Sequence, residues 1–213
     1  NFYPYRISGA HKLHDTDPIA HVNFCRWMLQ SVHDSIVDPS LVIMSDEAWF
    51  HLSGYVNSQN SRYWDTENPH LVHEVPLHDL KVGVWCGISA LRIIGPIFFY
   101  ETLNSERYVN NILRPFFNML TGPEKEYCYF QQDGATAHTS RNSMQEIENL
   151  FDDRVISRGR WPARSPDLSA CDFYLWGNLK QKVYRRNPRT LVDLENEIRT
   201  VISNIRQEEL QRV

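Results

Sequence analysis

Apolar residues gather in short runs through much of the chain, and such runs are typical of buried strands. A continuous apolar run of about four to eight residues bounded by turn residues suits a strand that is covered on both faces. The run 41–44 predicts a strand, and 49–52 predicts its hairpin partner. Further strands are expected at 82–86, 93–99, 127–130 and 155–156.

Helical spacing of apolar residues is found between and after these runs. Asp17 and Pro18 open a segment to about Val32, and an Asp N-cap followed by Pro is typical of a helix start. A helix is also expected from 104 to 120, although Pro115 interrupts its pattern. The remaining expected helices span 140–151, 172–184 and 190–205. This order of elements predicts an α/β fold with a mixed sheet flanked by helices.

Composition narrows the class of protein. The 213 residues are 42% hydrophobic and 23% charged, which fits one globular domain and argues against disorder. No apolar run is long enough for a transmembrane helix. The four cysteines form no C-x-x-C pair, so we expect structural thiols in a reducing compartment. The first residue is Asn1 and not Met, which indicates a fragment or a trimmed chain.

Charge is distributed unevenly along the sequence. The net charge is −4, which alone argues against nucleic acid as a partner. The segment 154–189, however, holds nine basic residues and only two acidic ones. Such asymmetry indicates a local site for a polyanion. The alternative is a solvated basic helix face.

Three aspartates stand out by their positions. Asp46 and Asp133 each follow an apolar run predicted to be a strand, and Asp172 heads a helix after the basic stretch. Such residues often cap turns or helices. If the three lie together, they raise one another's pKa unless a cation lies between them. Oxygen ligands favour Mg²⁺ or Mn²⁺, and such a site suits two-metal phosphoryl transfer.

Three motifs contain these aspartates. They are Ser45–Phe50 (SDEAWF), Gln131–His138 (QQDGATAH) and Trp161–Asp172 (WPARSPDLSACD). In this order they resemble the catalytic signatures of mariner-type DNA transposases, and the resemblance covers almost the whole chain. It implies a ribonuclease-H-like fold with Asp46, Asp133 and Asp172 as catalytic, metal-binding acids. Asp167 is the alternative third acid.

The sequence departs from the family pattern at several positions. The interval between Asp133 and Asp172 is a few residues longer than in typical mariner elements. Gly134 stands where many relatives have Asn, and Ala170 stands where Pro is usual. None of these departures removes a ligand.

The resemblance also implies a domain organisation. Residues 1–38 would form a linker and a first helix, and 39–213 would form the catalytic domain. The family's two N-terminal helix-turn-helix modules are absent from this sequence. The aperiodic polar stretch 54–79 would be the inserted clamp-type loop, which reaches the second subunit of a synaptic dimer. Disorder of this stretch is the alternative.

Other side chains are candidates for the site. His138 is either a contributor to catalysis or a capping or core residue, and Trp161 is expected to pack under the loop that holds it. Glu47 is excluded as a primary ligand because it points to the opposite side of the strand from Asp46. Contacts with DNA are expected from Arg160, Arg164, Ser165, Lys180, Lys182 and His138.

The function that the resemblance implies is cut-and-paste DNA transposition. The enzyme would be a nuclear endonuclease and polynucleotidyl transferase that uses two Mg²⁺ ions, with Mn²⁺ as a substitute. It would cleave transposon ends and transfer the strands into target DNA at TA sites. Its partners would be the terminal inverted repeats, the target DNA and a second copy in a homodimer, with no membrane. The alternatives are a domesticated or inactive DNA-binding protein and a nuclease for RNA–DNA hybrids.

Overall fold

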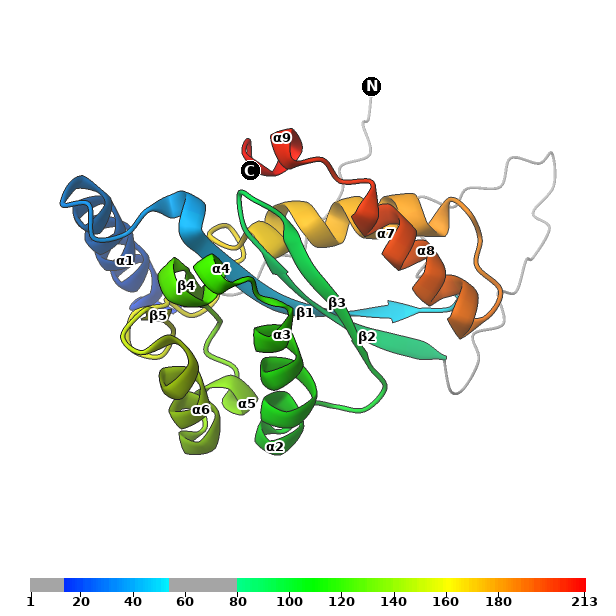
Figure 1. Cartoon of the computed structure of the whole chain (residues 1–213), viewed down its shortest axis with the longest axis horizontal. Helices are drawn as coiled ribbons and strands as arrows, with labels where there is room; N and C mark the ends of the chain where they lie inside the picture. The colour runs from blue at the N-terminus through cyan, green and yellow to red at the C-terminus, as the bar shows by residue number, and fades with distance from the viewer. Residues whose placement is uncertain (1–13, 54–79) are drawn as a thin grey trace, which may run out of the picture.

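Five strands form one mixed sheet in the computed structural model, which describes residues 14–53 and 80–213 (Figure 1). The strand order is β3-β2-β1-β4-β5. β1 pairs antiparallel with β2 and parallel with β4, so the sheet changes direction beside β1. The predicted mixed sheet is therefore confirmed. The strands span Val42–His51 (β1), Lys81–Ile88 (β2), Ile93–Phe99 (β3), Tyr129–Gln131 (β4) and Val155–Ile156 (β5).

The prediction of a hairpin between 41–44 and 49–52 is wrong. β1 continues without a turn to His51, and its antiparallel partner is β2, paired from Met44 with Ile88 to His51 with Lys81. The polar residues in the middle of β1 resemble a turn in the sequence. They lie within a strand because β2 satisfies the backbone of one edge along this whole length.

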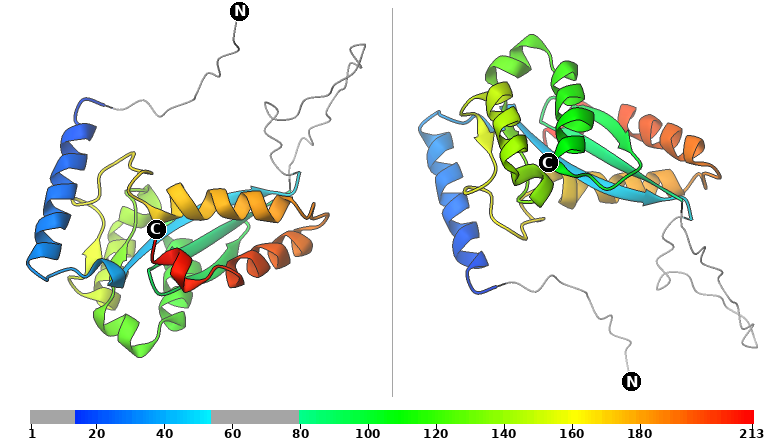
Figure 2. Two further views of the ribbon diagram at one scale, coloured as in Figure 1. Left: turned by 90° about the horizontal axis from the view of Figure 1, so that it is seen from above. Right: turned by 90° about the horizontal axis from the view of Figure 1, so that it is seen from below.

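Helices cover both faces of the sheet (Figure 2). On one face, alternate residues of β2, including Val82, Val84 and Cys86, pack against the C-terminal helices. On the other face, Trp85 packs on Phe116 with ring centroids 4.9 Å apart. The first face is covered by η3 (Cys171–Leu175), α7 (Trp176–Tyr184) and α8 (Leu191–Ser203), followed by α9 (Gln207–Leu210). The second is covered by α2 (Ser105–Arg107), η2 (Tyr108–Leu113), α3 (Arg114–Met119), α5 (Thr136–Thr139) and α6 (Arg141–Phe151), with α4 (Gly122–Tyr127) beside them.

Two expected elements differ from the prediction. The helix expected over 104–120 is divided, because η2 forms wide π-type turns before α3. Pro115 explains the division, since proline lacks the N–H that an α-helix interior requires and sits instead in the first turn of α3. Tyr127 ends α4 and does not begin a strand. The capping box of Thr121 and Glu124 starts α4, and this signal is visible in the sequence.

α1 (Asp17–His33) lies at the edge of the sheet beside β5 and the loop that follows it, and η1 (Pro39–Leu41) leads from it into β1. The Arg164 guanidinium donates two hydrogen bonds of 2.6 Å to the Asp17 carboxylate. Trp161 meets Phe24 edge to face, with centroids 5.1 Å apart. The loop before Asp172 is therefore tied to the first helix by one ion pair and one aromatic contact.

No helix within 14–53 and 80–213 has the length and apolar character needed to cross a membrane. All four cysteines are free thiols, with Cys86, Cys128 and Cys171 buried and Cys25 exposed. The buried thiols pack as small apolar groups, as the sequence predicts.

The ion pair between Arg92 and Glu124 generates the first prediction. Arg92 Nη2 lies 2.6 Å from Glu124 Oε2, and these bonds, with those from Thr121, hold the pKa of Glu124 at about 2. The pair therefore stabilises the fold above pH 4.5, and this contribution is lost as the pH falls toward 2. We expect Glu124→Gln to lower the free energy of unfolding by about 2 kcal/mol at neutral pH. Urea unfolding at several pH values measures this, and Glu126→Gln, at an exposed neighbour, should change little.

A second prediction concerns the attachment of α1. The hydrogen bonds from Arg164 lower the pKa of Asp17 to about 2, so the pair is charged at neutral pH. We expect Arg164→Ala to speed amide hydrogen exchange in α1 while β1 and β2 stay protected. Equal protection of α1 in the variant and the parent would contradict this role for Arg164.

Candidate active site

Asp46 and Asp133 lie where β1 and β4 stop pairing. The last parallel pair joins Met44 and Gln131. Each aspartate comes two residues after its strand's member of that pair, so the two carboxylates follow adjacent strands in the same direction. Asp46 is inside β1, and not past its end as expected, but it is past the segment that pairs with β4.

Asp172 lies near this pair but comes from a helical segment and not from a strand. It lies in the first turn of η3, and the thiol of the preceding Cys171 is 3.5 Å from the carbonyl oxygen of Met44 in β1. A cavity of about 280 Å³ is lined by all three aspartates. Asp167, the alternative third acid, is exposed and is not among the lining residues. Other lining residues include Ser45, Gln131, Gly134, Trp161, Arg164, Ser165 and Ser169.

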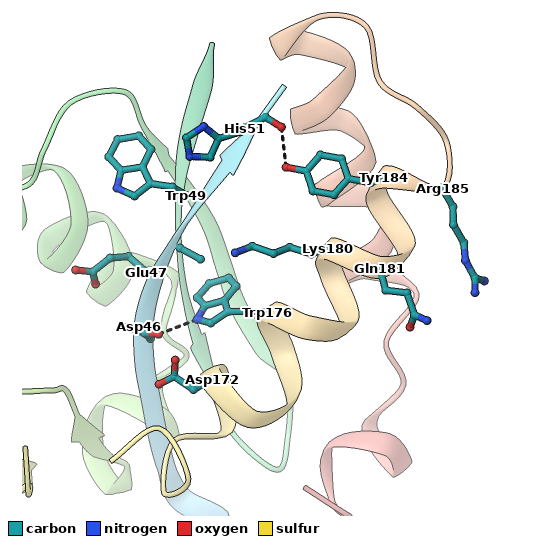
Figure 3. Close-up of a pocket in the computed structure, with 11 residues that line it drawn as sticks. Asp46, Glu47, Trp49, His51, Asp172, Trp176, Lys180, Gln181, Tyr184 and Arg185 are labelled. Atoms are coloured by element: carbon teal, nitrogen blue, oxygen red, sulfur yellow. Dashed lines mark hydrogen bonds between the residues drawn. The ribbon is translucent and has the colours of Figure 1, made fainter. Parts of the chain in front are cut away.

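Asp46 lies in an environment that disfavours its charge. Burial and the negative charge of Asp172 raise the pKa of Asp46 to about 7, against a hydrogen bond that lowers it. That bond is donated by Trp176 Nε1 to Asp46 Oδ2 over 2.7 Å (Figure 3). Burial and the charges of Asp133 and Glu47 also raise the pKa of Asp172. A cation between these groups would relieve the repulsion.

Asp133 is held by hydrogen bonds. His138 Nδ1 lies 2.6 Å from Asp133 Oδ1, which also accepts a bond from the backbone N–H of Ala135 at 2.9 Å. Burial by itself would raise the pKa of Asp133, but these bonds and the charge of His138 lower it. Burial by itself would lower the pKa of His138, but its contacts with Asp133 and Glu47 raise that pKa to about 10. The imidazole is therefore charged at neutral pH.

His138 is a core residue by position. Its side chain is 3% exposed, and its two ring nitrogens face the carboxylates of Asp133 and Glu47. The imidazole is thus packed in the core and is also in contact with one of the three aspartates.

The donor set can be compared with the needs of a divalent cation. Within the described ranges, no three His, Cys, Asp or Glu side chains are already gathered closely enough to hold an ion. Three carboxylates nevertheless border one cavity, and burial together with neighbouring negative charges raises the pKa of two of them, Asp46 and Asp172. Such a set fits Mg²⁺ or Mn²⁺ in its chemistry, because both ions prefer carboxylate oxygen.

A larger hollow of about 950 Å³ starts at the same acids (Figure 3). It is lined by Asp46 and Asp172 at one end and then by residues of α7 and of the second half of β1. Figure 3 shows Lys180 pointing toward β1, whereas Arg185 points away from it. Aromatic and basic side chains of this kind line grooves that bind nucleic acid. The lining residues beyond the acids are Glu47, Ala48, Trp49, His51, Trp176, Lys180, Gln181, Tyr184 and Arg185.

The aromatic part of this groove is not predicted by the sequence. Trp176, Lys180 and Tyr184 recur every four residues, so they share one face of α7. This spacing is visible in the sequence, but it is also typical of a helix packed on a core. Only the structure shows that the face borders the acids.

The predicted DNA contacts fall into two groups. Lys180 and Lys182 lie on α7, and Lys180 lines the groove. The ammonium group of Lys180 also lies over the ring of Phe50, 5.6 Å from its centroid. The other three lie before Asp172 and have internal partners. Arg164 pairs with Asp17, Ser165 Oγ donates to the carbonyl of Pro162 at 2.6 Å, and the Arg160 guanidinium lies over Trp27. All remain predictions as DNA contacts.

Known proteins resemble this chain in sequence and in fold. No protein-family model matches the chain. It is 31% identical over 150 residues to the Tc3 transposase of Caenorhabditis elegans, an alignment that covers 70% of this chain and 44% of that protein. The Mos1 transposase paired-end complex with left transposon end has a TM-score of 0.79 at 20% identity, covering 100% of this chain and 62% of that chain. The Mos1 catalytic domain with Raltegravir and Mg has a TM-score of 0.68 at 18% identity, covering 95% and 90%.

The chain spans less than two thirds of the Tc3 transposase and of the Mos1 chain in the paired-end complex. At these identities the Mos1 structures establish the fold, which is the ribonuclease-H-like α/β fold expected from the motifs. The Tc3 alignment adds the relationship in sequence. Together they place this chain among the mariner-like transposases.

Proposed function

We propose that this chain cleaves DNA at transposon ends in a metal-dependent reaction and joins the freed 3′ ends to target DNA. The observation that carries the proposal is the cavity bordered by Asp46, Asp133 and Asp172, which come from three separate parts of the fold. The same cavity shares Asp46 and Asp172 with the groove along α7. DNA lying in the groove would therefore reach the acids.

The chemistry divides between the metal and the chain. A bound pair of Mg²⁺ or Mn²⁺ ions supplies activation of a water or 3′-hydroxyl and stabilisation of the leaving oxygen. Asp46, Asp133 and Asp172 would hold the ions through carboxylate oxygens. Trp176 Nε1 donates to Asp46 Oδ2, and this hydrogen bond would orient the carboxylate at the site. Lys180 offers a positive charge to the phosphates in the groove. No protein nucleophile is required.

Finer features belong to the same proposal. They are insertion at TA dinucleotides, paired ends held by a homodimer, and action in the nucleus. Their support is the resemblance of the three motifs together with the solved relatives, which include a Mos1 paired-end complex and complexes with Mn and Mg.

Neutralising each acid tests the site. We expect Asp46→Asn, Asp133→Asn and Asp172→Asn each to weaken Mn²⁺ binding at least tenfold, because each removes a charged ligand. Calorimetric titration with MnCl₂ measures the affinity, and nicking of a supercoiled plasmid in Mn²⁺ measures cleavage, which should fall about a hundredfold or more. Asp167→Asn is the matched control and should resemble the parent chain.

The rival function gives a different result in this experiment. A transposase-derived protein that binds DNA without cutting it would retain plasmid binding and show no cleavage in saturating Mn²⁺. Its affinity for Mn²⁺ would also be indifferent to all three substitutions. That pattern would replace the proposed function with the rival.

The proposal also makes the metal affinity dependent on pH. The pKa of Asp46 is raised to about 7, so its carboxyl group is largely protonated at lower pH. A metal competes with that proton, and the affinity for Mn²⁺ should therefore rise steeply between about pH 6 and pH 8. Titrations across this range measure the slope, which should be shallower in Asp46→Asn. An affinity independent of pH would contradict the role of Asp46.

A further inference from the structure

Glu47 has no part in the proposed metal site, yet its carboxylate is held in a specific place. It follows Asp46 in β1 and points to the other side of the strand, as Figure 3 shows. Glu47 Oε1 lies 3.2 Å from His138 Nε2, and the Glu47 side chain is only 25% exposed. A carboxylate in such a setting is costly unless it meets an opposite charge. The contact with His138 supplies that charge.

His138 is fixed on several sides at once. The ring of Tyr108 lies against the imidazole, with centroids 4.3 Å apart. Gln132 Nε2 donates to the backbone carbonyl of His138 at 3.0 Å, and Gln132 Oε1 accepts from the Tyr108 hydroxyl at 2.7 Å. The ring therefore has little freedom to turn, and Glu47 is the charged group that faces Nε2.

Asp133 depends on this arrangement more than Asp46 does. β4 is three residues long, and Asp133 lies beyond its end with half of its side chain exposed. Oδ1 of Asp133 is engaged by both His138 Nδ1 and the N–H of Ala135. Oδ2 is consequently the oxygen available to the cavity, and the rotamer that presents it is the one that His138 holds.

We propose that Glu47 is a positioning residue, which orients His138 so that His138 holds Asp133 with one oxygen free for the metal. The chain of contacts runs from the far side of β1, through the helical segment after β4, to the second acid. Glu47 borders the groove, but its carboxylate faces His138 and is not one of the three proposed metal ligands. The inference rests on the proposed function, because it assigns the purpose of the network to metal binding by Asp133. Outer partners of metal ligands typically change affinity by about 10- to 100-fold.

The test uses Glu47→Ala, which removes the carboxylate, and Glu47→Gln, which keeps an oxygen that can accept from His138 Nε2. We expect Glu47→Ala to weaken Mn²⁺ binding about tenfold and to lower kcat for plasmid nicking by a larger factor than it changes KM for DNA. Glu47→Gln should retain most of the Mn²⁺ affinity and most of the kcat of the parent chain. The signal of bound Mn²⁺ in electron paramagnetic resonance should broaden in the Ala variant, because one ligand is less well ordered.

Glu146→Ala provides a matched control. Glu146 is also ion-paired, with Arg114 at 2.7 Å, and its side chain is 20% exposed. It lies in α6 and lines neither the cavity nor the groove. Because Glu146→Ala loses a partly buried ion pair, the midpoint of its thermal unfolding should fall, whereas its Mn²⁺ affinity and kcat should not change.

The outcomes separate this inference from the proposed function. One outcome is that Glu47→Ala binds Mn²⁺ and nicks DNA as the parent does, while Asp133→Asn loses Mn²⁺ affinity and nicking. The positioning role is then wrong and the proposed function stands. If Asp133→Asn also binds Mn²⁺ normally, the proposed function itself fails. Should Glu47→Ala not fold, Glu47→Asp decides, because its shorter side chain withdraws from His138. Full Mn²⁺ affinity in a folded Glu47→Asp would overturn the proposal.

Discussion

The parallel pairing of β1 and β4 is the constraint on which the rest of the structure depends. Three residue pairs, from Val42 with Tyr129 to Met44 with Gln131, align two strands so that an acid follows each. Ser45 Oγ adds a bond of 2.8 Å to the Gln131 carbonyl at the point of parting. The two carboxylates border one cavity, and the packed layers on both faces of the sheet hold the strands that carry them in place.

The three acids are not equivalent. Asp46 is paired with a neutral donor, Trp176, and its pKa is raised, whereas Asp133 is paired with charged His138 and its pKa is lowered. Asp172 comes from a helical turn and feels the charges of Asp133 and Glu47. Near neutral pH the site therefore contains one ionised carboxylate that is internally compensated and two that gain from a cation. This asymmetry follows from the burial of Asp46 beside Asp172, which the hydrogen bond from Trp176 only partly offsets, and from the bonds and charge that His138 supplies to Asp133.

The sequence is most informative where local pattern decides the outcome. Every strand overlaps one of the apolar runs, because buried strands need apolar residues on both faces. The order of the three motifs groups Asp46, Asp133 and Asp172 into one predicted site, and all three line one cavity. The prediction fails in the middle of β1, where Asp46 and Glu47 are polar because their side chains have partners in other elements, Trp176 and His138. The contacts of Glu47 with His138 and of Trp176 with Asp46 join residues distant in sequence, so no local pattern announces either.

The parting of β1 and β4 after Met44 and Gln131 makes the spacing of the acids a property of the backbone. Arg154 holds the chain just before β4 by donating to the carbonyls of Cys128 and Lys125 at 2.8 and 3.0 Å. Arg154 donates to none of the three acids, yet its bonds fix the backbone that leads into the strand before Asp133. The spacing of the acids therefore depends on scaffold residues as well as on the motifs that contain the acids. Specialisation of such a site can begin in its scaffold, ahead of any change in its ligands.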